Sequence, residues 1–248
     1  MNLLRFLTLI FVSAYGGLVF ANDIEAAKTA SKKTNKFIFS VAAVNETDLS
    51  FKLSAMLLNE ISKKTGDEME LIILPPEKAM VMLQAGRIDA EIARIKEYSK
   101  DYNELIMVNE PVATIPFYAY SMNKEIDITN IKALKKLRVA NVQGQIFTSV
   151  FFKDHKLFSA DSVRSGLLYL YNNQADIFVT DGFTAHRISQ AINTAELGIY
   201  KLEPPIAITN IHTFFNSKHT ELAKRFEKAL LEIKNEEKYK KVYKEHIN

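Results

Sequence analysis

The chain has 248 residues, of which 48% are hydrophobic and 25% are charged, proportions typical of a globular protein rather than a disordered or multispanning one. Its 32 lysines and arginines and 29 acidic residues alternate along the chain and leave a net charge of +3. A protein that binds nucleic acid concentrates its cations on one face or arm, so this pattern argues against nucleic acid as a partner. Cysteine is absent, which excludes disulfides, cysteine-based zinc sites, iron–sulfur clusters and thiol nucleophiles.

The first 21 residues have the pattern of a secretory signal peptide. Arg5 is the one charged side chain among them, and the apolar run that follows ends at Ala21, ahead of the polar Asn22. This run is short for a membrane span, which takes about 20 apolar residues, although a single N-terminal anchor is the alternative. We therefore predict export, a signal peptide over residues 1–21 and a flexible leader over residues 22–35.

Between residues 37 and 95 the apolar pattern alternates between strands and helices. Short runs rich in branched and aromatic residues predict strands at 37–44, 69–74 and 88–95. One helix is expected to begin after Asp48, whose side chain would cap it, and to end at Gly66. A second helix is expected to begin at Pro75-Pro76. Three strands and two helices within about 60 residues predict a parallel sheet with right-handed crossovers.

A second unit of the same kind follows. It has predicted strands at 137–142, 157–159 and 177–180, and predicted helices at 146–153, 161–173 and from 182 to about 191. Two extended segments, 110–122 and 200–216, connect the units. We predict an α/β protein with lobe 1 over 36–113 and 210–248 and lobe 2 over 114–209. A ligand would bind between the lobes, at the carboxyl ends of their strands.

Three local patterns resemble the family-3 periplasmic solute-binding proteins, the amino-acid-type receptors of ABC importers. Residues 80–94, MVMLQAGRIDAEIAR, are similar to the passage of helix, x-x-G-x-x-D and strand that ends lobe 1 in this family. Residues 175–181, ADIFVTD, are similar to the lobe-2 strand that delivers an aspartate to the cleft, and residues 214–243 to the returning strand and closing helix. The resemblance covers about 37–246 and implies a clamshell of two mostly parallel sheets, flanked by helices and joined by two hinge crossings.

The resemblance also implies a function. A monomeric periplasmic protein would capture a small polar solute, an amino acid or related organic anion, by hinge closure and present it to an inner-membrane ABC permease. The alternatives are a periplasmic sensor that feeds a signalling receptor and a small-molecule lyase on the same fold. The five histidines lack the spacing of a zinc site, and neither a P-loop nor a G-x-S-x-G elbow occurs, so we assign no catalytic residue, metal or cofactor.

The candidate arginine differs from the pattern of the family. Its amino-acid binders usually follow the third strand with a T-x-x-R segment whose arginine holds the ligand carboxylate. Here residues 95–101 read IKEYSKD without an arginine, and Arg94 lies on the strand itself. Two interpretations stay open. Arg94 forms a bidentate contact with a bound carboxylate or phosphate, or it forms a structural ion pair with Glu91, Asp101 or another acid.

The candidate aspartate has two interpretations as well. Asp181 follows the strand at 177–180 and precedes Gly182, so we expect it at the mouth of lobe 2. The resemblance matches it to the aspartate that binds a ligand amino group, and we predict that it faces Arg94 across the cleft. The alternative is an N-cap of the following helix, and one carboxylate is able to serve both roles.

The remaining ligand-binding candidates are weaker. Gln143, Gly144 and Gln145 precede a helix, where free backbone N–H groups bind anions, although a plain connection explains them equally well. Lys78 lies in the first turn after Pro75-Pro76 and either faces the cleft or is a solvated helix position. Tyr118, in the first extended segment, either walls the cleft or packs in the core or hinge.

Overall fold

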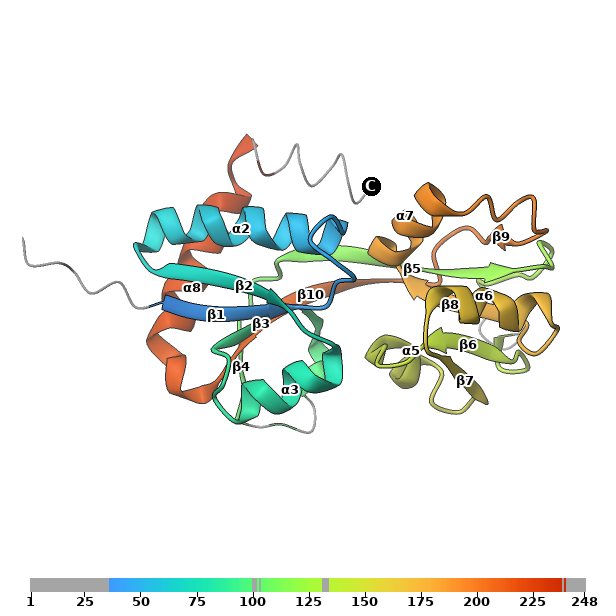
Figure 1. Ribbon diagram of the computed structural model, residues 1–248, viewed down its shortest axis with the longest axis horizontal. Coiled ribbons are helices and arrows are strands. Elements are labelled where there is room, and N and C mark those ends of the chain that lie inside the picture. The colour runs from blue at the N-terminus through green and yellow to red at the C-terminus, as the bar shows by residue number, and fades with distance from the viewer. Residues whose placement is uncertain (1–35, 100–101, 103, 131–133, 238, 240–248) are drawn as a thin grey trace, which may run out of the picture. The chain divides into compact units, whose positions relative to one another are not determined.

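A ten-stranded sheet organises the protein (Figure 1). The computed structural model describes residues 36–99, 102, 104–130, 134–237 and 239, so the predicted signal peptide and leader lie outside the described residues. The strand order is β2 (Glu68–Ile73), β1 (Lys36–Val41), β3 (Ala90–Ile95), β10 (Ala207–Phe215), β5 (Ala113–Ser121), β8 (Ile177–Asp181), β6 (Val139–Val142) and β7 (Leu157–Ala160). β4 (Ile106–Met107) also pairs with β10, and β9 (Tyr200–Lys201) with β5.

The first strand group comprises β1, β2 and β3 with their helices. β1 pairs in parallel with β2 and with β3, as predicted, and α2 (Leu49–Thr65) and α3 (Pro76–Gln84) make the connections. Pro76 is the first residue of α3, and Gly66 ends α2 in the left-handed conformation at φ +74°. The 3₁₀ turn η1 (Lys96–Ser99) follows β3. Figure 1 shows α2 on one side of these strands and α3 on the other.

The predicted side-chain cap of α2 is wrong. Asp48 occupies the N-cap position, but its carboxylate makes no capping hydrogen bond. Asp48 Oδ2 instead accepts hydrogen bonds from the Val44 N–H, at 3.2 Å, and from Arg187. The Oδ2 atom is therefore directed back toward the end of β1 and across to a distant helix, while Oδ1 accepts a 3.5 Å hydrogen bond from the Ser50 hydroxyl rather than from a backbone N–H of α2.

The second strand group comprises β6, β7 and β8, with α5 (Ile146–Phe151), α6 (Val163–Tyr171) and α7 (Gly182–Ala191). β6 pairs in parallel with both β7 and β8. The α6 helix begins later than predicted because Ser162 caps it, its hydroxyl accepting a hydrogen bond from the Ser165 N–H at 3.1 Å. Gly166 lets α6 approach the sheet closely, since a Cβ there would lie 3.1 Å from Cζ of Phe178 and closer still to two other ring atoms.

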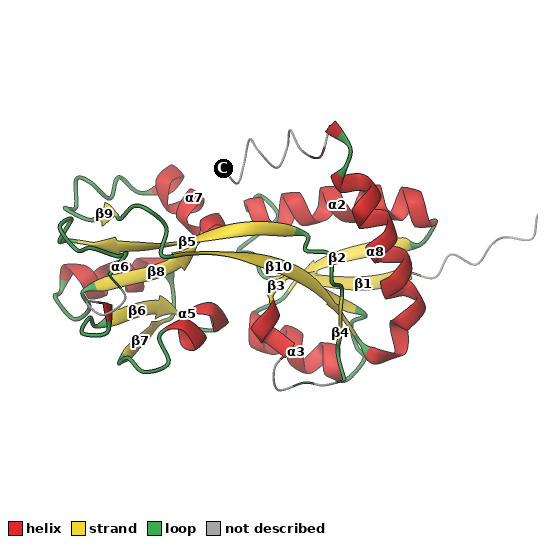
Figure 2. Ribbon diagram, turned by 180° about the vertical axis from the view of Figure 1, so that it is seen from behind, coloured by secondary structure: helices red, strands yellow, loops and turns green. Residues whose placement is uncertain are grey.

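β5 and β10 join the two strand groups. They pair antiparallel, from Ala113 opposite Ile211 to Phe117 opposite Ala207. β10 also pairs with β3, and β5 also pairs with β8, so the two predicted crossings form a ribbon inside a continuous sheet (Figure 2). The sequence pattern predicted both segments as extended but did not predict that they pair. The lobe boundaries at 113/114 and 209/210 stay a prediction.

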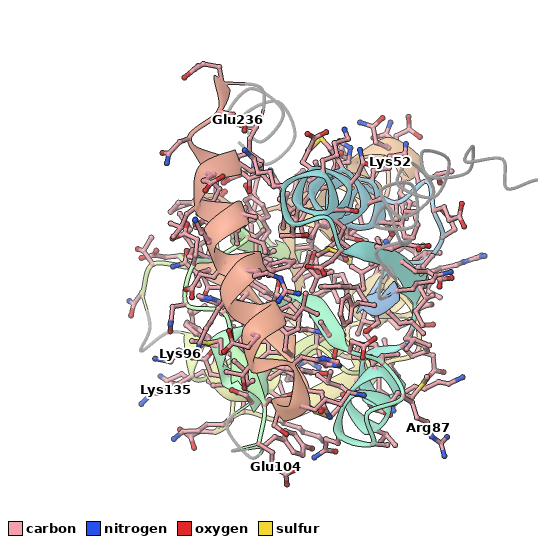
Figure 3. All side chains as sticks on the ribbon, turned by 90° about the vertical axis from the view of Figure 1, so that its left-hand side faces the viewer. Lys52, Arg87, Lys96, Glu104, Lys135 and Glu236 are labelled. Atoms are coloured by element: carbon pink, nitrogen blue, oxygen red, sulfur yellow. The ribbon has the colours of Figure 1, made fainter. Side chains whose placement is uncertain are left out.

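A long helix in the C-terminal part of the chain packs against the first strand group. After the 3₁₀ turn η2 (Ser217–His219), α8 (Thr220–Lys234) lies beside α2, as Figure 3 shows. Its Phe226 ring stands 5.3 Å from that of Phe215 and 5.7 Å from that of Phe39, and all three are fully buried. Glu236, labelled in Figure 3, pairs with Lys64 of α2 at 3.0 Å. Within the part of the chain that the structure describes, no helix has the length and apolar character needed to span a membrane.

Candidate ligand-binding site

A cavity of about 300 Å³ is lined by residues of both strand groups. It lies where the strands end: Ala42 follows β1, Ile95 ends β3, Val142 ends β6 and Asp181 ends β8. The carboxyl ends of parallel strands are where α/β proteins bind their ligands, and the volume suits a small molecule. Five of the seven candidates from the sequence line this cavity, namely Arg94, Gln143, Gly144, Gln145 and Asp181.

Arg94 forms an ion pair at the cavity wall. Its side chain is 12% exposed, and Nε donates to Oε1 of the fully buried Glu91 at 2.6 Å. Nη2 donates to the same oxygen, and the Tyr98 hydroxyl donates to the other. Burial raises the pKa of Glu91, although Arg94 and Tyr98 act against that shift. Arg94 thus has the predicted structural partner, while Nη1 makes no hydrogen bond within the described residues.

Backbone geometry brings Arg94 to the cavity. Ala93 has φ +67°, a left-handed conformation that residues other than glycine rarely adopt. In a regular strand successive side chains alternate between the two faces of the sheet. Here the consecutive residues Ala93, Arg94 and Ile95 all line the cavity. Such a break in the alternation leaves no signature in the sequence, because alanine is ordinary in a strand.

Asp181 is held by three donors. It is the N-cap of α7, with Oδ1 accepting from the Thr184 N–H at 3.0 Å. Its Oδ2 accepts from the Thr184 hydroxyl at 3.0 Å and from Gln145 Nε2 at 3.1 Å. The predicted N-cap is confirmed, and the carboxylate also faces the cavity. Because a carboxylate accepts about four hydrogen bonds, Asp181 keeps limited capacity for a ligand.

The Gln143–Gly144–Gln145 turn contacts the first strand group. Gly144 has φ +80°, and a Cβ there would lie 3.4 Å from Cγ of Pro76, so glycine suits both the backbone and the close approach. The Gln145 amide also donates to Thr180 Oγ1 at 3.1 Å and thereby fixes the turn to the end of β8. The turn leads into α5, whose Phe147 ring stacks on Phe117 with 3.7 Å between ring centroids. These stacked rings give the cavity a flat apolar wall.

The other two candidates lie elsewhere. Lys78 is exposed on α3 and is absent from the cavity wall in the described part of the chain. Tyr118 lies on β5 next to Phe117, and side chains alternate along a strand. Phe117 therefore lines the cavity between the strand groups, whereas Tyr118 lines a second cavity.

Two cavity residues were missed by reasoning from the sequence. Asp48, before α2, and Arg187, on α7, form an ion pair with 2.5 Å between Oδ2 and Nη1. The Asp48 side chain is 3% exposed and that of Arg187 is 35% exposed. A weak signal was available, since Thr184 and Arg187 are spaced i, i+3 after the Asp181 cap and therefore share a helix face. The partner of Arg187 lies 139 residues away and has no local signal.

The described residues of the site do not form a metal-binding cluster. Within the described ranges, no group of three or more histidine, cysteine, aspartate or glutamate side chains is placed to hold a metal ion. The charged residues of the cavity are instead two arginines and two aspartates, each aspartate already holding hydrogen-bond donors. The guanidinium, amide and hydroxyl groups of the cavity, beside its aromatic rings, are suited to binding a small polar solute.

The fold and the cavity define a class, the two-lobed periplasmic-binding-protein fold. A solved ancestral arginine-binding protein bound to glutamine is 18% identical, with 86% of this chain and 97% of that chain covered and a TM-score of 0.66. A histidine kinase sensor domain with similarity to periplasmic binding proteins is 12% identical, with 88% and 98% covered and a TM-score of 0.69. These similarities confirm the predicted fold class.

The family follows from the sequence match. The model of bacterial extracellular solute-binding proteins, family 3, matches residues 53–248, so the chain belongs to this family, as the sequence resemblance predicted. An uncharacterized protein of Shewanella oneidensis is 23% identical over 234 residues, which cover 89% of this chain and 87% of the relative.

Proposed function

We propose that this protein is an exported solute-binding protein that captures a small organic anion or amino acid and presents it to an ABC importer. The observation that carries the proposal is the cavity of about 300 Å³ between two strand groups, with an incompletely engaged arginine in its wall. Membership of the family of extracellular solute-binding proteins supports it. The predicted signal peptide supports a periplasmic location.

Arg94 is proposed as the anchor for an anionic group. Glu91 and Tyr98 hold the guanidinium in one orientation, while Nη1 stays available for a ligand oxygen. A preoriented guanidinium loses little freedom when it binds, and its planar array of donors matches a carboxylate or phosphate. Asp181 and the amides of Gln143 and Gln145 would bind further polar groups from the second strand group.

Closure about the β5–β10 ribbon is the proposed mechanism. Each strand group supplies part of the cavity wall, so a ligand that contacts both stabilises the arrangement in which they are close. The ribbon passes between the groups as two paired strands, which permits bending while the hydrogen-bonded register is kept. The free energy of binding to both walls would shift the population toward the closed state.

The hydrogen bonds of the carboxylates near the cavity favour a protein that binds its ligand without converting it. General acid–base catalysis takes a carboxyl or imidazole group that can exchange a proton with the ligand. Asp181 accepts hydrogen bonds from three donors, and Glu91 is enclosed by Arg94 and Tyr98. Asp48, the other carboxylate of the cavity wall, accepts hydrogen bonds from Val44 and Arg187. All three carboxylates already have partners within the protein, so we propose a binding protein rather than a lyase.

A sensor is the second candidate function. The similarity to a histidine kinase sensor domain, with a TM-score of 0.69, is the observation that favours it. The same cavity would then report its occupancy to a receptor instead of a permease. Genes for a permease and an ATPase next to the gene for this protein would favour transport, whereas a neighbouring sensor kinase gene would favour signalling.

The test is a search for the ligand followed by substitution of the anchor. The purified protein is screened by thermal shift against amino acids and small organic anions, and hits are titrated by calorimetry. Arg94→Ala should weaken binding of an anionic hit about tenfold or more, the effect of losing charge-assisted hydrogen bonds. Arg164→Ala, at an exposed position on α6, is the matched control and should bind normally. Full affinity in Arg94→Ala would overturn Arg94 as the anchor.

A further inference from the structure

A second cavity, of about 280 Å³, lies against the strand β5 that also walls the first. Its wall includes Pro116, Tyr118 and Tyr120 from β5, helix α7 at His186 and Ser189, and Lys201 from β9. The alternation along β5 explains its position, since Phe117 faces the first cavity while the residues on either side face the second.

Tyr120 presents an unpaired hydroxyl to this cavity. The residue is 2% exposed, yet its hydroxyl makes no hydrogen bond with any described residue. The hydroxyl oxygen is not fully enclosed by protein atoms, and Tyr120 lines the second cavity, so the hydroxyl is open to that cavity. Burial raises the pKa of Tyr120, which keeps the phenol protonated and available as a donor. Buried polar groups are normally hydrogen-bonded, so we expect the Tyr120 hydroxyl to donate to an acceptor bound in this cavity.

Lys201 supplies a cation on the same face of the sheet as Tyr120. Lys201 and Tyr120 are directly opposite each other in the pairing of β5 with β9, so their side chains leave the sheet on the same face about 5 Å apart at Cβ. The ammonium lies 4.2 Å from the ring centroid of Tyr118 and 2.7 Å from Glu203 Oε1. The pair with Glu203 is exposed on both sides, and such pairs are weak enough for a ligand to compete.

The balance of donors and charges favours an anion. Among the described residues of this wall there is no carboxylate, while Lys201 is a cation and Tyr120, Ser189 and Thr194 carry hydroxyls. Besides burial, the charges of Glu203 and Asp181, which lie outside the wall, raise the pKa of Tyr120 and so help to keep its hydroxyl a donor. The remaining wall is apolar and partly flat, with Pro116, Tyr118 and Ile188 among its residues. A flat apolar body that carries one negative group matches both parts of the wall.

We propose that this second cavity is a separate binding site for a small aromatic carboxylate. The carboxylate accepts hydrogen bonds from the Tyr120 hydroxyl and the Lys201 ammonium, and the ring packs against Pro116 and Tyr118. The site uses none of the polar groups proposed to bind a solute between the strand groups. It can therefore be tested whether or not that proposed function holds.

The test uses benzoate as the probe and benzamide as its neutral counterpart. Benzoate is titrated into the isotope-labelled protein and followed by ¹H–¹⁵N NMR. The expected result is shifts at the amides of residues 189, 194 and 201, with weaker binding of benzamide. Tyr120→Phe and Lys201→Met should each weaken benzoate binding about fivefold, because each removes one hydrogen bond to the carboxylate.

Matched variants separate this site from the first cavity. Lys224→Met removes a lysine that is 67% exposed on α8 and should leave benzoate binding unchanged. Arg94→Ala should also leave it unchanged, even where it abolishes binding of a solute at the first cavity. Lys201→Met changes an exposed side chain and preserves the test if Tyr120→Phe fails to fold. Absence of benzoate binding, shifts confined to residues around Arg94, or normal binding by Lys201→Met would each overturn the proposal.

Discussion

Asp48 and Arg187 form an ion pair between the start of α2 and helix α7, with 2.5 Å between Oδ2 and Nη1. Among the ion pairs formed between described residues, none of the others joins the two strand groups. The Asp48 carboxylate is nearly enclosed, and a buried charge requires a partner. Both residues line the first cavity. Because they belong to different strand groups, any change in the separation of the groups changes this contact.

Substitution of Asp48 should therefore lower stability. Asp48→Asn removes the negative charge, leaves Arg187 without its ionic partner and should lower the free energy of unfolding by about 1–3 kcal/mol. Urea denaturation at neutral pH measures the change. Arg225→Gln breaks a more exposed pair with Asp67 inside the first strand group and should cost less. Equal stability of Asp48→Asn and the unsubstituted protein would show that the contact contributes nothing.

A second ion pair should make stability depend on pH. The hydrogen bonds from Arg138 hold the pKa of Asp176 below its usual value of 3.8. A lowered pKa means that the folded state binds the proton less readily than the unfolded state. The stabilisation is therefore complete above the unfolded-state pKa and is lost as the pH falls through the lower, folded-state pKa.

Asp176→Asn tests this dependence. At neutral pH it should lower the free energy of unfolding by about 1–2 kcal/mol, and the difference from the unsubstituted protein should shrink as the pH falls below 4. Chemical denaturation across a series of pH values gives both quantities. Asp161→Asn, at an exposed position before α6, should show no such trend. A difference that stays constant down to acidic pH would contradict the assignment.

Local signals made most of the fold predictable. Gly66 and Pro76 mark helix ends by backbone rules that depend on neighbouring residues alone, and both occupy the predicted places. The cavity residues Arg94 and Asp181 are predictable from the sequence because they lie at or near the carboxyl ends of apolar strands.

Contacts between distant segments were not predictable. The Asp48 carboxylate appeared as a helix cap because its partner, Arg187, is remote in the sequence. The sequence leaves Tyr118 open between the cleft and the core or hinge, because an extended segment alone does not show which of its faces lies toward the ligand. The left-handed conformation of Ala93 lies where the register of β3 with β10 shifts, and it has no signal in the residue itself.

Export is predicted from residues outside the described chain. The Arg5 start, the apolar run and the small residue at Ala21 predict cleavage ahead of Asn22. N-terminal sequencing of protein recovered from the periplasm of a Gram-negative expression host should give a start within a few residues of Asn22. An intact Met1 in the membrane fraction would instead indicate an anchor.

Tyr98 should act as a positioning residue for Arg94. Its hydroxyl donates to Glu91 Oε2, and its ring lies 5.2 Å from Cζ of Arg94, so it contacts both members of the ion pair. Burial raises the pKa of Tyr98 above its usual value, which keeps the hydroxyl protonated as a donor. Tyr98→Phe keeps the ring but leaves a buried carboxylate oxygen without this donor, and should lower the free energy of unfolding by about 1–3 kcal/mol.

The effect of Tyr98→Phe on binding distinguishes positioning from a purely structural role. If Glu91 orients Arg94 for an anionic solute, affinity should fall by about two- to fivefold, less than in Arg94→Ala, because the guanidinium is still present but less well held. Calorimetry with the hit from the ligand screen measures this loss. Tyr171→Phe, a change of the same chemistry at a tyrosine of α6 that is 60% exposed, should alter neither quantity. A Tyr98→Phe protein that is less stable but binds with full affinity would show that Tyr98 serves the fold alone.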